Sequence, residues 1–295
     1  MRNNLLIFFT MNIDAILKHS TPRRESELLL AYVLKKPREF LIAHPEVKIS
    51  KLQETRYKYL SWKLRRGYPL AHLTGHREFY GLDFLVNKHT LVPRPETELM
   101  VELAVQAIKS QKLQVKSCVL IDVGTGSGCI PISIQRTLNK EQGASECIAI
   151  DISKPALRVA KKNAKKHGTN ITFLHGNLLQ PLTNHRSLFT DHCSLTITAN
   201  LPYLTKSQFD SEPSIQKEPY SALVADDNGL ALYKELLEQI KLFVTRYRLQ
   251  VTLFMEIDPA QTVSLTTHCT EQFPHGTIMT HKDLLGHDRI VSLTL

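Results

Sequence analysis

Residues 119–128 read Val-Leu-Ile-Asp-Val-Gly-Thr-Gly-Ser-Gly, and this stretch decides the fold. An apolar run typical of a buried strand leads into three glycines, and an apolar helical pattern follows from Cys129. Glycine lets the backbone turn sharply and approach a ligand without a clash at Cβ. Asp151 ends the next apolar run, and a carboxylate there can accept both ribose hydroxyls of an adenosine. The stretch therefore predicts an adenosine-containing cofactor at the edge of an α/β sheet.

Strand-like and helix-like segments alternate from residue 118 to the last residue. Alternation of this kind predicts a mostly parallel sheet with helices on both faces, as in the Rossmann-like class of folds. The expected strands are 118–123, 146–151, 171–175, 194–199, 250–257, 276–280 and 289–294. The expected helices are 128–138, 154–167, 229–246 and 259–272.

The first third of the chain reads as a small bundle of helices. Ser50 and Gln53 form a capping-box pattern ahead of the longest expected helix, and Gly67 ends that helix. Four helices are expected here. The first covers 13–19, the second begins at Pro22, the third covers 38–44, and the fourth follows Ser50 and runs to Arg66.

Two short apolar stretches on either side of Gly81-Leu82 predict a tight β-hairpin after the bundle. Pro93 and Pro95 follow the hairpin, and a helix with acidic residues in its first turn is expected to run to about residue 110. We therefore divide the chain into a helical domain (1–74), a hairpin linker (75–92) and a catalytic domain (93–295).

Composition and charge limit the classes of protein to which the chain can belong. The chain has 295 residues and a net charge of +9, and residues 1–90 hold 16 Lys and Arg against 8 Asp and Glu. A basic surplus of this kind can steer an acidic protein or an RNA-containing partner, although solvated helix faces explain it as well. No apolar stretch approaches the roughly 20 residues of a membrane helix. Five cysteines without a C-x-x-C pair, and histidines without ligand spacing, predict neither a disulfide framework nor a metal site.

The glycine spacing distinguishes between two adenosine cofactors. Gly124, Gly126 and Gly128 spell G-x-G-x-G, whereas the dinucleotide fingerprint is G-x-G-x-x-G. S-adenosylmethionine has no pyrophosphate and does not require the turn that cradles one. The spacing therefore favours S-adenosylmethionine over NAD. The expected cofactor-binding residues are Asp122, Gly124, Thr125, Gly126, Ser127, Gly128, Asp151, Ile152, Asn177, Leu178 and Asn200.

Asn200-Leu201-Pro202-Tyr203 directly follows the strand expected at 194–199 and predicts a clamp for a planar –NH₂ group. The Asn200 side-chain carbonyl can accept one N–H, and the backbone carbonyl of Leu201 can accept the other. Pro202 fixes the turn, and Tyr203 can stack beside the plane. These four residues are the expected catalytic and substrate-binding residues, and a clamp of this kind fits methyl transfer to an amide or an exocyclic amine.

The ordered series of motifs resembles the HemK/PrmC family of protein-(glutamine-N5) methyltransferases. The resemblance covers nearly the whole chain and rests on residues 66–69, 78–84, 92–98, 122–130, 151–157, 200–203, 218–230 and 288–289. It implies a class I S-adenosylmethionine methyltransferase fold and methylation of the glutamine in the Gly-Gly-Gln motif of class 1 peptide chain release factors. It also implies a cytoplasmic enzyme, an N-terminal domain that recognises the substrate, and substrate contacts from Arg94 and Glu96. The family usually has Pro where this chain has Leu201, but Leu supplies the same backbone carbonyl.

Other functions remain open at this point. An N6-adenine methyltransferase of RNA or DNA would use the same clamp on a flipped base, and Asn-Leu-Pro-Tyr is also found in rRNA adenine dimethyltransferases. Those enzymes resemble only the catalytic domain, so direct nucleic-acid binding is not expected. An enzyme that methylates a glutamine of a ribosomal protein typically has other residues where this chain has Glu96 and Thr97. A non-catalytic binding module and an NAD oxidoreductase fit the motifs less well. The sequence leaves open the oligomeric state, the preferred release factor, and whether Met1 or Met11 is the first residue.

Overall fold

The computed structural model describes residues 11–18, 20, 22–112, 117–138, 146–185, 193–247 and 249–295. The chain divides into two compact units, Met1–Gly75 and His76–Leu295. Residues 1–10, which bear on the choice between Met1 and Met11, lie outside the described residues, as does residue 19 at the end of the first expected helix. Within the described residues, no helix is both long and apolar enough to span a lipid bilayer.

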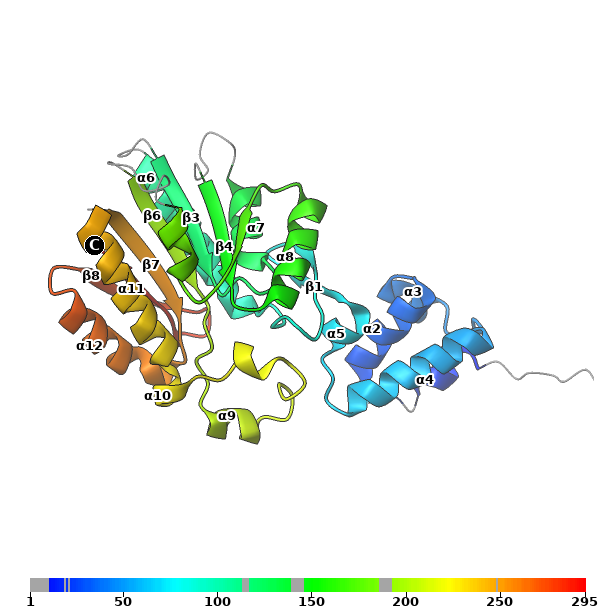
Figure 1. Cartoon of the computed structure of the whole chain (residues 1–295). Helices are drawn as coiled ribbons and strands as arrows, with labels where there is room; N and C mark the ends of the chain where they lie inside the picture. Colours follow the sequence, from blue (N-terminus) through cyan, green and yellow to red (C-terminus); the bar gives the residue numbers. More distant parts are fainter. Residues whose placement is uncertain are drawn as a thin grey trace, which may run out of the picture. The chain divides into compact units, whose positions relative to one another are not determined.

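The first unit is a bundle of short helices around an apolar core (Figure 1). The capping box predicted at the start of α4 is present, since Ser50 and Gln53 exchange side-chain and backbone hydrogen bonds. Gly75 ends α5 in the left-handed conformation, with φ of +80°. Leu29, Leu30 and Leu41 are buried in the core. The helices are α1 (Ile13–Leu17), α2 (Arg23–Leu34), α3 (Arg38–Ala43), α4 (Lys51–Arg65) and α5 (Leu70–Thr74), of which α5 was not predicted.

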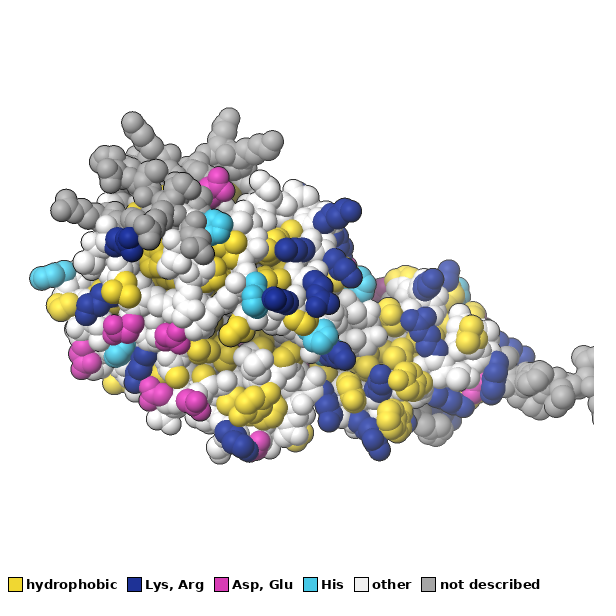
Figure 2. Space-filling view, viewed as in Figure 1, with side chains coloured by type: hydrophobic (Ala, Val, Ile, Leu, Met, Phe, Trp, Pro, Cys, Tyr) yellow, Lys and Arg dark blue, Asp and Glu magenta, His cyan; other side chains and the backbone are white. Residues whose placement is uncertain are grey.

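Cationic and aromatic side chains pack against one another near the carboxyl end of α4, which Arg66 directly follows. Arg66 lies over the Trp62 ring at 4.3 Å, and Lys63 lies over the Tyr59 ring at 4.7 Å. Tyr59 and Trp62 are both exposed. Figure 2 shows Lys and Arg side chains gathered on the visible face of this unit.

The predicted hairpin is present, but its turn is one residue earlier than expected. Strands β1 (His76–Phe79) and β2 (Leu82–Leu85) pair so that Phe79 lies opposite Leu82. The turn residues are therefore Tyr80 and Gly81, with φ of +52° and +69°. Positive φ at both central positions is the requirement of a type I′ turn, and Gly81 supplies the second position. The prediction that Gly81-Leu82 form the turn is wrong.

The hairpin belongs to the second unit, because Phe79 and Phe84 are buried in one of that unit's core clusters. Glu98 at the start of α6 (Glu98–Lys112) accepts a hydrogen bond from the Tyr80 backbone N–H through Oε1 at 2.9 Å. Asn163 of α8 (Lys154–His167) accepts from the Leu85 N–H at 2.8 Å. The hairpin is thus fixed to two helices of the unit.

The second unit contains a seven-stranded sheet with the order β5-β4-β3-β6-β7-β9-β8. The first five strands in this order are parallel, and β9 runs antiparallel to both of its neighbours. This sheet confirms the predicted fold class, and every expected strand lies within two residues of its observed bounds. The strands are β3 (Ser117–Val123), β4 (Glu146–Asp151), β5 (Thr172–His175), β6 (Cys193–Ala199), β7 (Gln250–Glu256), β8 (Thr277–Lys282) and β9 (Asp288–Thr294).

Helices cover both faces of this sheet (Figure 1). Successive residues of β3 point to opposite faces. Val119 and Ile121 pack into one apolar cluster with residues of α11 and α12, whereas Cys118 and Leu120 pack into the other with residues of α6 and α7. The main helices are α6 (Glu98–Lys112), α7 (Cys129–Thr137), α8 (Lys154–His167), α11 (Ala231–Tyr247) and α12 (Thr262–Gln272).

Shorter elements connect the sheet at the carboxyl ends of its parallel strands. The sequence did not indicate those between β6 and α11, because each is too short to show a hydrophobic period. They are α9 (Lys206–Ser211), η4 (Tyr220–Ala222) and α10 (Asp226–Gly229). Others are η1 (Pro95–Thr97), η2 (Gln180–Asn184) and η5 (Pro259–Gln261), and the last is the first turn of the helix expected at 259–272.

Candidate active site

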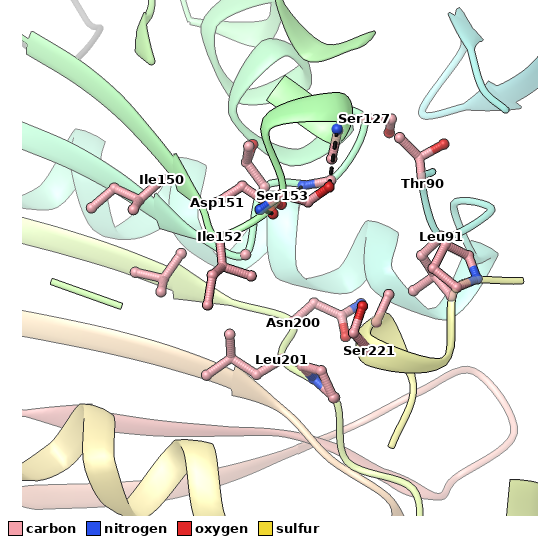
Figure 3. A pocket seen from close by; sticks show the side chains of 18 of the residues that line it. Thr90, Leu91, Ser127, Ile150, Asp151, Ile152, Ser153, Asn200, Leu201 and Ser221 are labelled. Atoms are coloured by element: carbon pink, nitrogen blue, oxygen red, sulfur yellow. Dashed lines mark hydrogen bonds between the residues drawn. The ribbon is translucent and has the colours of Figure 1, made fainter. Parts of the chain in front are cut away.

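A cavity of about 390 Å³ opens at the carboxyl ends of β3, β4 and β6 (Figure 3). Ligands of open α/β sheets bind at this edge, and the volume falls within the range of small-molecule pockets. The loops that follow β3, β4, β5 and β6 form one side of the cavity. The opposite side comes from the segment before η1 and from the residues around η4, including Thr90, Leu91, Arg94, Pro219, Ser221 and Ala222.

The glycine turn after β3 forms the floor of the cavity. Gly124 has φ of +75°, and a Cβ added there would lie 3.0 Å from Cδ2 of Leu201. The backbone N–H groups of Gly124 and Thr125 donate to the Ile150 carbonyl at 2.9 and 3.0 Å. A larger residue at position 124 would therefore be strained by the positive φ and would press on the Leu201 side chain in the turn that follows β6.

Asp151 lies at the end of β4 and lines the cavity beside the glycine turn. Its Oδ2 accepts from the Gly126 N–H at 2.8 Å, and its Oδ1 accepts from the Ser153 N–H at 2.7 Å. Burial raises the pKa of Asp151, and the two backbone N–H groups oppose that rise. Each carboxylate oxygen has a further lone pair, so the side chain can still accept hydrogen bonds from a ligand.

Asp122, the other acidic residue expected at the cofactor site, does not line the cavity. It is fully buried, and its Oδ1 accepts from the Thr198 hydroxyl at 2.7 Å. Burial raises the pKa of Asp122 to about 7, while the hydrogen bond from Thr198 lowers it. Gly128 is also outside the lining, because it packs against Ala160 of α8. The other expected cofactor-binding residues, Gly124, Thr125, Gly126, Ser127, Ile152, Asn177, Leu178 and Asn200, all line the cavity with Asp151.

Asn177 follows β5 and contributes a polar group to the cavity. Its Nδ2 donates to Oε1 of Glu235 at 2.7 Å, so the side-chain carbonyl is the part left to accept from a ligand. Ile152 is 64% exposed and adds an apolar surface at the mouth. Among the residues that the structure describes, no group of three or more metal-ligating side chains comes together.

Asn200 is held by a contact from a distant part of the chain. Its Nδ2 donates to Oγ1 of Thr97 at 3.1 Å, although 103 residues separate the two. This bond fixes the nitrogen end of the amide, and the carbonyl end is therefore the acceptor that remains. The Leu201 N–H donates to the Tyr233 hydroxyl at 3.2 Å, which orients the next peptide. Asn200, Leu201 and Pro202 all line the cavity.

Tyr203 lies outside the lining of the cavity. Its hydroxyl donates to Oε1 of Glu256 at 3.4 Å. Glu256 ends β7 and is buried, and burial raises its pKa to about 7. The Gln261 side chain donates to the Tyr203 carbonyl at 2.8 Å. The turn after β6 is therefore fixed to the ends of two neighbouring elements.

An ion pair joins two segments of the wall opposite the sheet. Arg94 donates to Oε1 of Glu218, and the Val92 N–H donates to Oε2 at 2.8 Å. Glu218 is buried, so the pair fixes the segment before η1 against the segment before η4. Arg94 lines the cavity, whereas Glu96, the other expected substrate-binding residue, is exposed and outside the lining.

Three residues that hold the site were not assigned a site role from the sequence: Thr97, Tyr233 and Glu256. Thr97 lies inside the segment 92–98 that carries the family resemblance, but its contact with Asn200 is not a local property. Glu256 follows an apolar run in the same way as Asp151 does. Its position after an apolar run, where a parallel strand is expected to end, was therefore the feature of the sequence that could have identified Glu256 as a site residue.

Comparisons with known proteins agree on the class of protein. Residues 13–75 match the PrmC N-terminal domain family, and residues 114–242 match a methyltransferase domain family. The chain is 36% identical to a release factor glutamine methyltransferase of Enterococcus faecalis over 251 residues, which is 84% of each chain. It is 31% identical to one of Bacillus anthracis over 271 residues, 90% of each chain. In fold it resembles the hMettl16 catalytic domain solved with a MAT2A 3′UTR hairpin, with a TM-score of 0.55, 17% identity and 90% of each chain covered.

Proposed function

The chain belongs to the family of release factor glutamine methyltransferases, and we propose that it methylates the side-chain nitrogen (N5) of the glutamine in the Gly-Gly-Gln motif of class 1 release factors. The observation that carries the proposal is the position of the Asn200 amide in the same cavity as Asp151. We assign Asp151 as the acceptor for the ribose and Asn200 as the acceptor for the substrate amide.

The cavity fits S-adenosylmethionine, the methyl donor of this family. We assign Asp151 the role of accepting from the ribose hydroxyls, and the Asn177 carbonyl the role of accepting from the adenine amino group. Ile152 and Leu178, which also line the cavity, would supply apolar surface for the adenine. When bound, the cofactor supplies a methyl group on a sulfonium sulfur, which is an electrophilic carbon.

The residues around Asn200 explain how an unreactive amide can be methylated. The nitrogen of an amide is a poor nucleophile because its lone pair is delocalised into the carbonyl. We assign the Asn200 Oδ1 and the Leu201 carbonyl the role of accepting the two N–H groups of the substrate amide. Two fixed acceptors draw electron density towards the nitrogen and hold it in one orientation. Positioning of this kind can lower a barrier by several kcal/mol.

The proton balance needs no strong base. A new N–C bond forms as the C–S bond of the donor breaks, and the substrate nitrogen then carries one proton more than the neutral product. That proton leaves to water, which yields the N5-methylglutamine side chain. Pro202 fixes the turn that presents the Leu201 carbonyl. The hydrogen bond from Tyr203 to Glu256 supports a bracing role for Tyr203 rather than the stacking role expected from the sequence.

Mass spectrometry of the substrate tests this proposal. A release factor incubated with the protein and S-adenosylmethionine should gain one methyl group on the glutamine of its Gly-Gly-Gln motif. Asn200→Ala should retain cofactor binding but lose at least about tenfold in kcat, or roughly 1.4 kcal/mol of barrier. Asn170→Ala, at an exposed loop before β5, is the matched control and should behave as the wild type. Near-normal turnover of Asn200→Ala would exclude the clamp.

The same experiment separates the alternative substrates. Labelled cofactor is supplied with release factor, with ribosomal RNA, or with ribosomal proteins. Label in RNA would support the N6-adenine alternative, and label in a ribosomal protein would support the related glutamine enzyme. Family membership supports the release factor, and because that substrate acts at the ribosome, we propose that the reaction takes place in the cytoplasm.

A further inference from the structure

We propose that Leu284 and Leu285, at the tip of the hairpin formed by β8 and β9, are a docking surface for an apolar patch on the release factor outside its Gly-Gly-Gln motif. The inference rests on the proposed function, because it concerns how the substrate protein is held while its glutamine lies in the cavity. Neither leucine lines the cavity, so this surface is separate from the cofactor site and from the amide clamp.

The two leucines are consecutive in the chain and both are open to solvent. Leu284 is fully exposed and Leu285 is 80% exposed. Single exposed leucines are common on protein surfaces, so exposure alone does not indicate a binding site. What distinguishes this pair is the fixed backbone of the turn that carries it.

Asp283 fixes the turn between the two strands, which consists of residues 283–287. Its side chain is only 7% exposed. Its Oδ1 accepts from the N–H groups of Leu285 and His287 at 2.9 and 3.0 Å, and its Oδ2 accepts from Nη2 of Arg289 at 3.2 Å. The Asp283 N–H donates to the His287 carbonyl at 2.9 Å. One carboxylate thus holds the tip of the turn and the strand that follows it.

This turn lies at the edge of the sheet where the cavity opens. Both β7 and β8 run antiparallel to β9, so the carboxyl end of β8 lies at the same edge as the carboxyl ends of β6 and β7. In the order of the sheet β8 is three strands from β6, or roughly 14 Å at the usual spacing of strands. Asn200 directly follows β6, and Leu284 follows β8 by two residues. The leucines therefore share an edge with the amide clamp.

Hydrogen bonds join the base of the hairpin to the end of β7. The Ile257 N–H donates to the Arg289 carbonyl at 2.9 Å, and Nη1 of Arg289 donates to the Ile257 carbonyl at 3.5 Å. Ile257 directly follows Glu256, whose Oε1 accepts from the Tyr203 hydroxyl in the turn after β6. The position of the hairpin is therefore fixed relative to the turn that forms the clamp.

A protein substrate accounts for leucines displayed at this place. When a glutamine on a folded protein enters the cavity, the surface around that glutamine faces the same edge of the sheet. A typical protein–protein interface covers about 800 Å² on each partner, which is a patch roughly 30 Å across. Such a patch, centred on the glutamine, includes a turn roughly 14 Å away. Apolar side chains on a fixed turn lose little freedom when they are covered, and an apolar surface is the partner that they match.

Kinetics and binding with intact release factor test the docking surface. The Leu284→Ala, Leu285→Ala double variant should raise both KM and Kd for the release factor at least about fivefold. Its kcat and its Kd for S-adenosylmethionine should change less than about twofold. Leu284→Ala alone should show part of the increase. Leu242→Ala is the matched control, because Leu242 is 71% exposed but lies in the second half of α11, which leads back to the amino end of β7.

Substitution of Asp283 tests the fixed turn while both leucines are kept. Asp283→Ala removes the hydrogen bonds that hold the turn and should raise KM for the release factor about twofold or more. Asp283→Asn keeps an acceptor for the two backbone N–H groups and should restore most of the binding. Thermal unfolding identifies a misfolded variant, and the leucine variants stay informative in that case, because substitutions of exposed side chains have little effect on stability.

The inference is overturned if the double variant keeps the KM and Kd of the wild type for the release factor, or if Leu242→Ala weakens binding as much. Sedimentation of both proteins tests the other occupant, since a dimeric wild type and a monomeric double variant with unchanged KM would mean that the leucines join two copies of this chain. A wild type that neither binds nor methylates release factor would instead contradict the proposed function. The failures are therefore distinguishable in one set of assays.

Discussion

At the scale of the residue, Asp122 illustrates a carboxyl group whose burial costs stability. Its pKa is raised from an ordinary value of 3.8 to about 7, mainly by burial. Below pH 3.8 the carboxyl is protonated in both the folded and the unfolded chain, so the pKa difference does not change the free energy of unfolding. As the pH rises from there to about 7, the unfolded chain ionises first, so stability is lost over that window and stays low above it. The loss from three pKa units amounts to at most about 4 kcal/mol.

Asp122→Asn should therefore raise the stability of the protein at neutral and alkaline pH. Asn is neutral and of the same shape, and its carbonyl can still accept from Thr198. The Tm of the variant should exceed that of the wild type by several degrees at about pH 8, and the gain should shrink towards pH 4. Thermal unfolding across this range measures the difference. Asp210→Asn, at an exposed position of α9, is the control, and an equal effect of both substitutions would contradict the account.

At the scale of the element, the turn after β6 is held in place by two other segments. The Gln261 side chain of η5 donates to the carbonyls of Tyr203 and Asn228 at 2.8 and 2.7 Å. Gly229 ends α10 with φ of +82°, and a Cβ there would lie 1.9 Å from the Tyr203 carbonyl oxygen. The backbone approaches so closely that only glycine fits. The position of the turn thus depends on packing between α10, η5 and β6.

Gly229→Ala should displace this turn. Gly168→Ala is the matched control, since Gly168 also has a positive φ but has open space around its Cβ. Gly168→Ala should lower the free energy of unfolding by about 1–2 kcal/mol, because Ala is strained in the left-handed conformation. Gly229→Ala has the clash in addition and should lower the free energy of unfolding by about 3 kcal/mol or more. Urea unfolding measures the two losses, and kcat should fall only in Gly229→Ala. Equal losses of stability, with kcat unchanged, would show that the close approach does not position the turn.

The regular elements were predictable from the sequence because their signals are local. Apolar runs bounded by Gly or Asp indicate the parallel strands, and the Ser50 capping box indicates the start of α4. The bond between Thr97 and Asn200, and the burial of Glu256, depend on which elements become neighbours. A pattern along the chain carries no information on such contacts. The motifs therefore predicted most of the expected residues that line the cavity, but not the residues that hold Asn200 and Tyr203 in place.

At the scale of the whole molecule, charge is unevenly distributed between the two units. Residues 1–75 carry 14 Lys and Arg against 6 Asp and Glu, whereas the remaining residues carry 23 against 22. The basic unit is also the one with the cationic and aromatic face on α4. Long-range attraction accelerates the encounter of a basic surface with an acidic one, and salt screens it over about 10 Å at 0.1 M. We therefore propose that the first unit attracts an acidic surface on the substrate protein.

Neutralising charges on the first unit should weaken the capture of release factor more than neutralising the same number on the second. Arg24→Gln with Arg65→Gln removes two exposed charges from α2 and α4, and Lys161→Gln with Lys165→Gln removes two from α8. The first pair should raise KM for the release factor by about twofold or more and flatten its dependence on salt, with kcat unchanged. The second pair should leave both nearly as in the wild type. Steady-state rates across a range of salt concentrations measure this, and equal shifts in both pairs would mean that only the total charge matters.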